Sequence, residues 1–295
     1  MTRAVNKTRT QAWGLLTPML LIMVGVTAWP LMRTIWLSLT SATIGGDPAQ
    51  WVGLGNYWEA ITNQAFRESV GRTLYFTVTS VGLELVLGLL VGLMLNQKFR
   101  GRAFARALLV LPWALPTIVN AMMWRLIDGP EYGALNALLT QIGVLEDYRS
   151  WLGDPGVAME MVILADVWKN YPFIALIVLA ALQTVPDDLY EAARLDGAGA
   201  WTRFLNVTLP GIVGPLSVAI VLRVIEAFKV FDIVYVMTKG GPEDTTKPVS
   251  FLVYQEAFSY LRIGSGAAYA ILMALFSACL IAAYIVLLRR QEGST

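Results

Sequence analysis

The sequence predicts an all-α membrane protein with six spanning helices and with both termini in the cytoplasm. Of its 295 residues, 56% are apolar and only 15% are charged, whereas an average soluble domain carries about 25% charged residues. The apolar residues gather in stretches of roughly 20, the length that a helix needs to cross a bilayer. Lys and Arg are divided unequally between the segments that join these stretches. Together these observations indicate a polytopic membrane protein.

Six apolar stretches are long enough to cross a membrane. The first is too long for the core of a signal peptide and does not end in a small-x-small cleavage pattern, so we expect it to be retained as a span. The fourth and fifth stretches also contain charged residues. The six stretches are residues 14–39, 74–95, 107–127, 157–182, 212–237 and 267–288.

The positive-inside rule predicts the orientation of these spans. With a cytoplasmic N-terminus, the inner segments hold eleven Lys and Arg residues and the outer segments hold six. The inner loop "NQKFRGRAFAR" contributes four of the eleven. This orientation places segment 187–210 inside and the acidic loop 128–154 outside. Along the chain we expect two parts: residues 1–65, with the cytoplasmic N-terminal segment, the first span and an outer lead, and residues 66–290, a core with five further spans.

The composition also narrows the chemistry that the chain can perform. It contains no His, which is the commonest metal ligand and general base. Cys279 is the only cysteine, so an internal disulfide is impossible and a cysteine metal site is not expected. The net charge of +1 argues against nucleic acid as a partner. We therefore expect no catalytic residues and no metal ligands.

The inner segment "DDLYEAARLDGAGAWTRFLNVTLP", residues 187–210, is polar and lies between two apolar stretches. Asp188 and Glu191 have the spacing of a capping box, which predicts a short helix from about Asp188. Gly197 and Gly199 would end this helix. A second amphipathic turn would present Trp201, Phe204 and Leu205, and Pro210 would open the fifth span, where its missing N–H costs little.

Within this segment, "EAARLDGAGAWTRFLNVTLP" resembles the EAA loop of ABC-transporter permeases. The resemblance implies that the loop docks into a groove on a cytoplasmic ATPase and transmits its motion, with Glu191 as the main contact. When only the spacing of the capping and turn residues is considered, the alternative is that this segment is a simple capped connector between two spans. The residues that match the loop's pattern are Glu191, Ala192, Ala193, Asp196, Gly197, Ala198, Phe204, Leu209 and Pro210.

Further stretches resemble the carbohydrate branch of this family, of the maltose-transporter first-permease type. They are "VGLGNYWEA", "LVLPWALPTIVNAMMW", "GALNALL", "LAALQTVPDDLYEAA" and "FDIVYVMTKGGPEDTT". The resemblance covers the chain from about Thr17 to Leu288. It implies a type I ABC importer permease in the plasma (inner) membrane of a bacterium or archaeon, here without the extra N-terminal spans and the large outer insertion of the maltose permease.

The source of energy is expected to lie on other subunits. The sequence contains no G-x-x-x-x-G-K-[ST] stretch, which is the loop that cradles nucleotide phosphates. We therefore expect a transport subunit rather than an enzyme, with no cofactor bound by this chain and with ATP and Mg on a partner ATPase. The resemblance implies two copies of that ATPase, a second homologous permease and an extracytoplasmic solute-binding protein.

Polar residues inside the fourth and fifth stretches are candidates for a substrate path. Ionisable side chains in a bilayer face partners or a water-filled path. Arg223, Glu226, Lys229 and Asp232 are each three residues apart, so they form either a mutually neutralised group or a polar wall of the path. In "DVWKNYPFIA", Lys169 and its neighbours put aromatic rings beside hydrogen-bonding groups, which suits a sugar. The resemblance to the maltose-type site implies substrate contacts at Asn170, Phe173, Arg223, Glu226, Ala227 and Val230. With these, the expected path residues are Trp168, Asn170, Tyr171, Phe173, Arg223, Glu226, Ala227, Lys229 and Val230.

Several alternatives stay open at this stage. Arg223 and Glu226 replace the residues that the maltose permease has at these positions, which argues against maltose itself. Another sugar, a polyol or glycerol phosphate, or no direct contact with the substrate by this subunit, all stay open. Glu84 and Arg125 are expected to be structural ties. An amino-acid or peptide permease is opposed by "GLGNY" and "TKGGP", and an ion-driven secondary transporter by the absence of a visible repeat. A membrane enzyme would need a cluster of catalytic groups.

Overall fold

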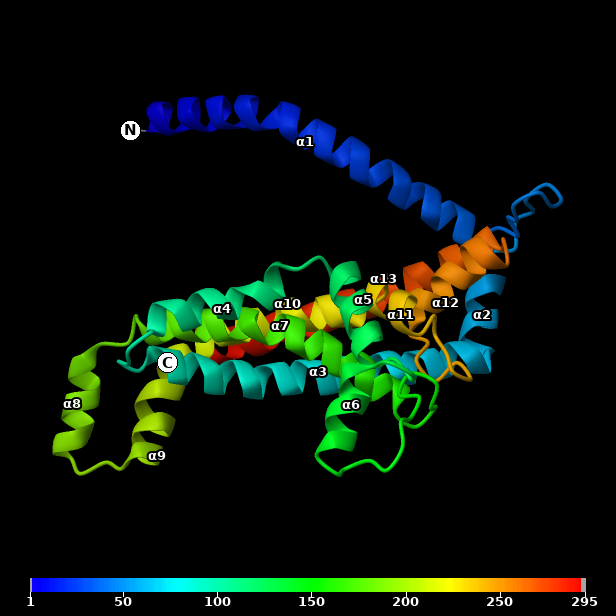
Figure 1. Ribbon diagram of the computed structural model, residues 1–295. Coiled ribbons are helices and arrows are strands. Elements are labelled where there is room, and N and C mark those ends of the chain that lie inside the picture. Colours follow the sequence, from blue (N-terminus) through cyan, green and yellow to red (C-terminus); the bar gives the residue numbers. More distant parts are fainter. Residues whose placement is uncertain (1, 293–295) are drawn as a thin grey trace. The chain divides into compact units, whose positions relative to one another are not determined.

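The computed structural model describes the backbone of residues 2–292, and Figure 1 shows that this part of the chain is helical. Its one β pairing within those residues is an isolated bridge between Thr40 and Trp51. The elements are α1 (Thr2–Ser38), α2 (Gly55–Thr62), α3 (Gln64–Asn96), α4 (Arg102–Ala114), α5 (Thr117–Ile127), α6 (Ala134–Gln141), α7 (Ala158–Leu182), α8 (Asp187–Leu195), α9 (Ala200–Arg203), the π turn η1 (Phe204–Thr208), α10 (Leu209–Phe228), α11 (Asp232–Met237), α12 (Val249–Tyr254), the π turn η2 (Gln255–Ser259) and α13 (Ile263–Glu292).

Five of the described helical stretches are long and apolar enough to cross a membrane, and a bent pair of helices is a sixth candidate. The pair is α4 and α5, whose axes differ by 95° across a break at Leu115 and Pro116. Proline disfavours a helical residue before it, and Leu115 accordingly has an extended backbone. The predicted all-helical class is confirmed, whereas the count of six spans and the cytoplasmic termini stay predictions. The five stretches are Leu16–Ser38, Gln64–Asn96, Ala158–Leu182, Ala200–Phe228 and Ile263–Tyr284.

The helices divide into two compact units. The first unit contains the residues up to Phe66 together with Leu252–Leu275, and the second contains Arg67–Phe251 together with the residues from Phe276 onward. In the first unit, the Asn56 side chain donates hydrogen bonds to the carbonyls of Ser38 and Thr40, at 2.8 and 2.9 Å, and so fixes the end of α1 against α2. The predicted boundary near residue 65 stays a prediction.

Helix α7 lies at the centre of the second unit and packs against α4 and α10 (Figure 1). Two glycines four residues apart let α3 approach α7 closely. A Cβ atom on Gly88 would lie 2.5 Å from Cβ of Ile174, and one on Gly92 would lie 2.7 Å from Cγ1 of Val178. Small residues at this spacing are typical of tightly packed membrane helices. The second unit is therefore built around one buried helix, and this helix also carries polar residues.

The fifth predicted span is not one helix, contrary to the sequence-based expectation. Helix α10 ends at Phe228, and α11 begins at Asp232. The three residues between them, 229–231, lie outside both helices. Irregular backbone at membrane depth is tolerated only where it is buried in protein or lines a cavity that water can fill. A break without proline or glycine therefore points to a cavity at this level.

Segment 187–210 has the predicted helix, turn and helix, but the predicted capping box is wrong. Helix α8 begins at Asp187, one residue early, and its N-cap is Pro186, which has no side-chain acceptor for the first N–H groups. Gly197, with φ +77°, forms the expected turn after α8. Pro210 is the second residue of α10, but α9 and η1 lead into it as continuous helix. Because proline has no N–H, the helix lacks one backbone hydrogen bond at Pro210. The π turn η1, which is wider than an α-helical turn, directly precedes this point.

Candidate substrate cavity and coupling segment

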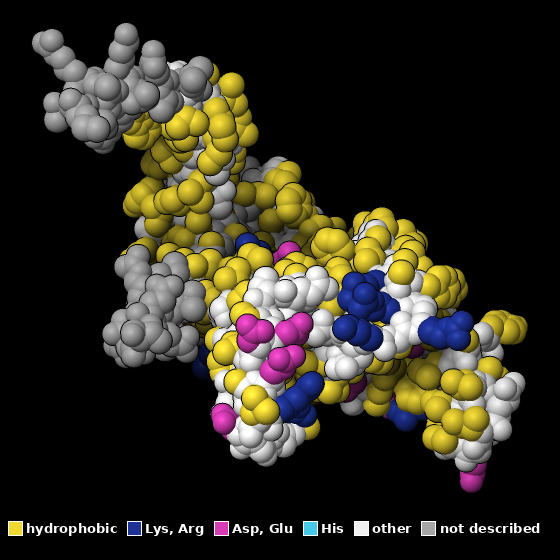
Figure 2. Space-filling model, turned by 90° about the vertical axis from the view of Figure 1, so that its left-hand side faces the viewer, with side chains coloured by type: hydrophobic (Ala, Val, Ile, Leu, Met, Phe, Trp, Pro, Cys, Tyr) yellow, Lys and Arg dark blue, Asp and Glu magenta, His cyan; other side chains and the backbone are white. Residues whose placement is uncertain are grey.

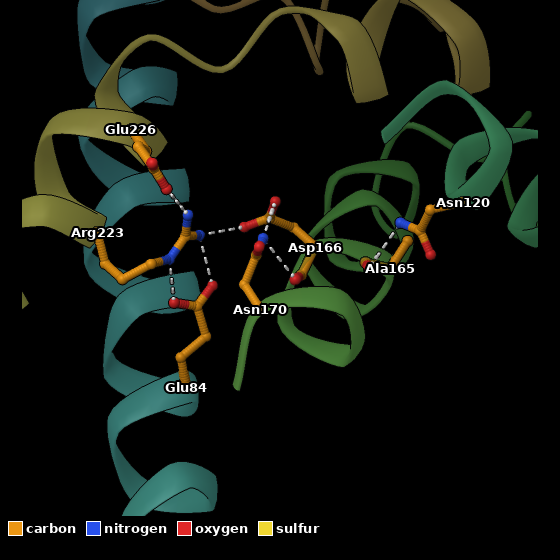
Figure 3. Close-up of polar contacts among 7 residues, drawn as sticks. All are labelled: Glu84, Asn120, Ala165, Asp166, Asn170, Arg223 and Glu226. Atoms are coloured by element: carbon orange, nitrogen blue, oxygen red, sulfur yellow. Dashed lines mark hydrogen bonds and ion pairs between the residues drawn. The ribbon is translucent and has the colours of Figure 1, made fainter. Parts of the chain in front are cut away.

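Four charged side chains from three helices meet inside the second unit (Figure 3). Arg223 of α10 donates to both carboxylate oxygens of Glu84 of α3, at 2.7 and 2.8 Å. It also donates to Asp166 of α7 at 3.2 Å and to Glu226, one turn along its own helix, at 2.7 Å. Glu84, Asp166 and Arg223 are buried, whereas the Glu226 side chain is 69% exposed. We call these four residues the ion cluster.

The ion cluster can exist at membrane depth because each of its three carboxylates accepts a hydrogen bond from the one guanidinium, that of Arg223. Burying an unpaired charge costs several kcal/mol, and a close partner offsets that cost only if the geometry is good. The two-pronged contact between Arg223 and Glu84 is the strongest geometry available to this pair. Asn170 donates to the carbonyl of Asp166 at 3.0 Å and to its carboxylate at 2.9 Å, which holds that side chain toward Arg223. The cluster therefore joins α3, α7 and α10.

A cavity of about 400 Å³ adjoins the ion cluster. Both irregular breaks described above border it: Trp113 and Thr117 flank the break between α4 and α5, and 229–231 lie between α10 and α11. Discontinuous helices at membrane depth commonly form substrate sites in transporters. The lining residues are Trp113, Thr117, Asp166, Lys169, Asn170, Arg223, Glu226, Lys229, Val230, Phe231, Asp232 and Ile233.

The cavity lining is polar, with equal numbers of acidic and basic side chains. Lys169 and Lys229 make no ion pair with any residue whose side chain is described, so their ammonium groups are available to a solute. Trp113 offers an aromatic ring that is 45% exposed, and Phe173 stacks behind it with ring centroids 6.1 Å apart. The cavity therefore presents hydrogen-bond donors and acceptors beside the aromatic side chains of Trp113 and Phe231.

The coupling segment, residues 187–210, is exposed along its first helix. Helix α8 buries none of its residues, and Leu195 at its end is 89% exposed. Beyond the glycine turn, Trp201 is 70% exposed and stacks on Phe204 at 5.5 Å between ring centroids. An exposed apolar surface of this kind is typical of a protein interface.

One hydrogen bond ties α8 to the helix that leads to the cavity. The hydroxyl groups of Tyr190 and Thr208 lie 3.1 Å apart, which joins α8 to the π turn η1. From Ala200 to Phe228 the backbone is one helical stretch of 29 residues, and a helix of this length spans about 40 Å. The same stretch carries Arg223 and Glu226. The coupling segment and the cavity are therefore connected by continuous helix.

Residues 84–293 match the family described as "Binding-protein-dependent transport system inner membrane component". The chain belongs to this family. It is thus an inner-membrane permease component of an ABC importer, as the EAA loop indicated, and the residues of the ion cluster and the coupling segment all lie within the matched region.

Curated relatives support this assignment over most of the permease. The trehalose/maltose transport system permease protein MalF of Thermococcus litoralis is 41% identical over 85% of this chain and 83% of its own length. The sulfoquinovosyl glycerol transport system permease protein SmoG of Agrobacterium fabrum is 34% identical, over 94% and 90% of the two chains. The trehalose transport system permease protein SugA of Mycobacterium tuberculosis is 34% identical, over 90% and 84%.

A solved structure has the same fold. A chain of a bacterial ABC transporter that imports the acidic polysaccharide alginate superposes on this permease with a TM-score of 0.82, at 22% identity and with 96% of each chain covered. A second structure shows that transporter in complex with its alginate pentasaccharide-bound periplasmic protein. At this identity the likeness establishes the helical arrangement of an ABC importer permease.

The structure brings five of the nine predicted path residues to the cavity, namely Asn170, Arg223, Glu226, Lys229 and Val230. The other four lie elsewhere. Trp168 contacts Trp124 edge to face at 6.1 Å between ring centroids, and Tyr171 packs in an apolar cluster formed by α3, α4 and α7. Phe173 stacks on Trp113, and Ala227 is buried in the core.

Sequence reasoning missed five residues of the cavity: Phe231 and Ile233, at the unexpected helix break, and Trp113, Thr117 and Asp166. A signal existed for each of the last three. Asp166 is an acid in an apolar stretch, one helical turn before Asn170, and the other two flank Pro116 in "LPWALPT". The two expected structural ties do join helices: Glu84 joins α3 to α10, and Arg125 donates to the Val236 carbonyl of α11 at 3.4 Å.

Outside the cavity, the residue that follows α5, Asp128, is a buried acid that does not belong to the ion cluster. Asp128 is 1% exposed, and neither of its carboxylate oxygens has a hydrogen-bond partner among the described residues. Burial raises the pKa of Asp128 to about 6. Nearby, the Asn136 side chain accepts a hydrogen bond from the Trp151 indole at 2.8 Å and donates to the Arg149 carbonyl at 2.9 Å, which closes this loop on itself.

Proposed function

We propose that this permease is a transmembrane subunit of an ATP-driven, binding-protein-dependent sugar importer and forms half of its translocation path. The single observation that carries the proposal is the cavity at which two helix breaks and the ion cluster meet. The three relatives named above are permease proteins of sugar or sugar-derivative transport systems, which supports the same substrate class. A second, homologous permease would supply the other half.

The chemistry of the cavity favours a neutral solute with many hydroxyl groups. A sugar needs donors and acceptors for its hydroxyls and a ring face for its C–H surface. Asn170, Glu226 and Lys229 provide the first, and Trp113 provides the second. A volume of about 400 Å³ lies in the range of small-molecule sites. Arg223, whose guanidinium is already engaged by three carboxylates, would position Glu226 rather than bind the sugar itself.

A charged polyol such as glycerol phosphate is the second candidate. Lys169 and Lys229 make no ion pair with any residue whose side chain is described, although both line the cavity. Two ammonium groups on one cavity suit a phosphate. The cavity lining also holds three acids, which balance its three basic side chains and oppose the binding of a dianion, so we place the neutral sugar first.

We also propose that the coupling segment docks on a separate ATPase, which binds ATP and Mg, with two copies per transporter. The exposed surface of α8 and the Tyr190 to Thr208 contact support this role, because they give a docked helix a rigid connection to α10. Docking would place this segment and both termini in the cytoplasm. The proposed coupling residues are Glu191, Ala192, Ala193, Asp196, Gly197, Ala198, Phe204 and Pro210.

The test is sugar-dependent ATP hydrolysis and uptake by the whole transporter in proteoliposomes, with a panel of loaded binding proteins. Glu226→Ala is expected to change which sugar is carried, or how fast, more than it changes ATP hydrolysis without sugar. Glu131→Ala, an exposed glutamate outside the cavity lining, is the matched control. Unchanged uptake of every sugar by Glu226→Ala would remove this residue from the path, and uptake of glycerol phosphate alone would favour the second candidate.

A further inference from the structure

Lys98 and Arg100, in the loop between α3 and α4, and Arg102, at the start of α4, surround a shallow cavity that is open to the surface. Together with Phe99 they line a space of about 420 Å³. All three cations are exposed, and none makes an ion pair with a residue whose side chain is described. The positive-inside rule concerns only how many Lys and Arg residues a loop contains, not where their side chains lie. The rule therefore does not explain why these three cations surround one cavity.

The loop is held in a defined shape. Arg106, in the first turn of α4, donates to the Leu95 carbonyl near the end of α3 at 3.0 Å. Gly101, with φ +87°, makes the tight turn between the two helices, and its carbonyl accepts the first hydrogen bond of α4, from Ala105 at 3.0 Å. The cations therefore extend from a fixed backbone, which reduces the entropy that a ligand would have to remove.

An apolar strip continues from this cavity along the outward face of α4. Phe104, Leu108 and Leu111 follow one another at helical spacing and are 69%, 48% and 60% exposed. The opposite face of α4 packs against α7 through the buried Leu109. Figure 2 faces the end of the molecule where α3 ends and α4 begins, and it shows Lys and Arg side chains gathered beside hydrophobic ones.

We propose that this cavity binds the headgroup of an anionic phospholipid, with the acyl chains along the strip on α4. Phosphate oxygens accept charge-assisted hydrogen bonds from Arg and Lys, and basic pockets beside membrane helices suit such headgroups. The strip selects a lipid over a soluble anion, because it is exposed and lies on a helix of the candidate bent span. One ligand thus accounts for both unpartnered surfaces.

The test measures lipid binding to the whole transporter after delipidation in detergent, by native mass spectrometry with phosphatidylglycerol. Loss of each cation at an anionic lipid surface weakens binding about fivefold, so Arg100→Gln/Arg102→Gln is expected to weaken it roughly 25-fold. Arg67→Gln/Lys239→Gln removes the same charge at exposed positions elsewhere and is expected to bind like the unaltered chain. Phe104→Ala is expected to weaken the binding of phosphatidylglycerol, because it removes the most exposed side chain of the apolar strip on α4.

Four results would overturn the proposal. If lipid binding depends only on the net charge of the chain, Arg100→Gln/Arg102→Gln and Arg67→Gln/Lys239→Gln would weaken it equally. Phosphatidylcholine with the same acyl chains would bind as tightly as phosphatidylglycerol if the cations play no part. Glycerol 1-phosphate would compete at concentrations as low as the lipid's if the cavity is a soluble-anion site. Finally, loss of the ATPase subunit from the Arg100→Gln/Arg102→Gln transporter would make this surface a protein interface.

Discussion

Two glutamates of this permease occupy opposite settings. Glu84, in α3, is completely buried, and Arg223 binds both of its carboxylate oxygens. Glu191, in α8, is exposed on a helix that buries none of its residues. The buried charges of the ion cluster are paired because an unpaired charge at membrane depth is energetically costly. The charged side chains of α8, by contrast, are solvent-exposed. We infer that buried charge here holds helices together and that exposed charge is available to a partner.

The largest expected effect is on stability, for Glu84→Ala. This change leaves the buried Arg223 without its two-pronged partner, and breaking a buried pair from one side costs about 3–5 kcal/mol. The measurement is thermal unfolding of the transporter in detergent, together with its folded yield. Glu226→Ala is the matched control, because its exposed carboxylate contributes about 1 kcal/mol or less to an ion pair. Equal losses in the two variants would contradict the comparison.

Glu191→Ala is expected to impair transport and to leave stability nearly unchanged, which is the reverse of the result expected for Glu84→Ala. Because α8 packs against no core, its thermal stability should change by about 0.5 kcal/mol or less. If the side chain docks on the ATPase, uptake should fall at least tenfold while ATP hydrolysis continues, as measured in the same proteoliposomes. Asp187→Ala removes an acid from the same helix outside the matched motif and serves as its control. Unaltered uptake in Glu191→Ala would leave α8 as a simple connector.

The sequence predicted the coupling segment better than it predicted the ion cluster, and the reason is distance along the chain. The turn at Gly197 depends on local backbone preferences, which a short window reveals. The contact between Glu84 and Arg223 joins residues 139 positions apart, and no local pattern specifies it. The charge spacing along α10 did indicate that Arg223 and Glu226 face a polar environment.

Local patterns also failed in two places. The capping box was wrong because Pro186, rather than Asp188, takes the N-cap position. The break at 229–231 was missed because these residues include neither proline nor glycine and lie within a mostly apolar stretch, whose composition predicts a continuous helix. Its irregular backbone lies where a cavity exists, and cavities depend on tertiary packing that composition does not encode.

Asp128 provides a third setting, because it is a buried acid whose carboxylate has no hydrogen-bond partner in the described part of the chain. We therefore expect it to make stability depend on pH. Its pKa in the folded chain is raised to about 6, so the ionised form is disfavoured. The unfavourable contribution is therefore absent near pH 4, grows between about pH 4 and 6, and is complete at pH 8. Asp128→Asn is expected to raise the free energy of unfolding at pH 8 by about 2–3 kcal/mol and to have little effect at pH 4.

The measurement for Asp128 is thermal unfolding at both pH values, and Asp154→Asn is its control. A hydrogen bond from the Gly156 backbone N–H and the neighbouring Arg149 lower the pKa of the exposed Asp154. That acid therefore stabilises the fold above its unfolded pKa, and its removal should lower stability at pH 8. A pH-independent gain from Asp128→Asn would show that burial does not disfavour its charge.

The smallest expected effect is that of Asp188→Ala. An N-cap acid contributes about 1 kcal/mol, but Asp188 lies inside the first turn of α8, which has no side-chain cap. Only its interaction with the helix dipole remains, and for an exposed side chain this is about 0.3–1 kcal/mol and screened by salt. Amide hydrogen exchange over α8 should therefore accelerate by about fivefold or less. A larger acceleration, insensitive to salt, would mean that Asp188 caps the helix in solution and that the exposed acids of this segment have structural roles after all.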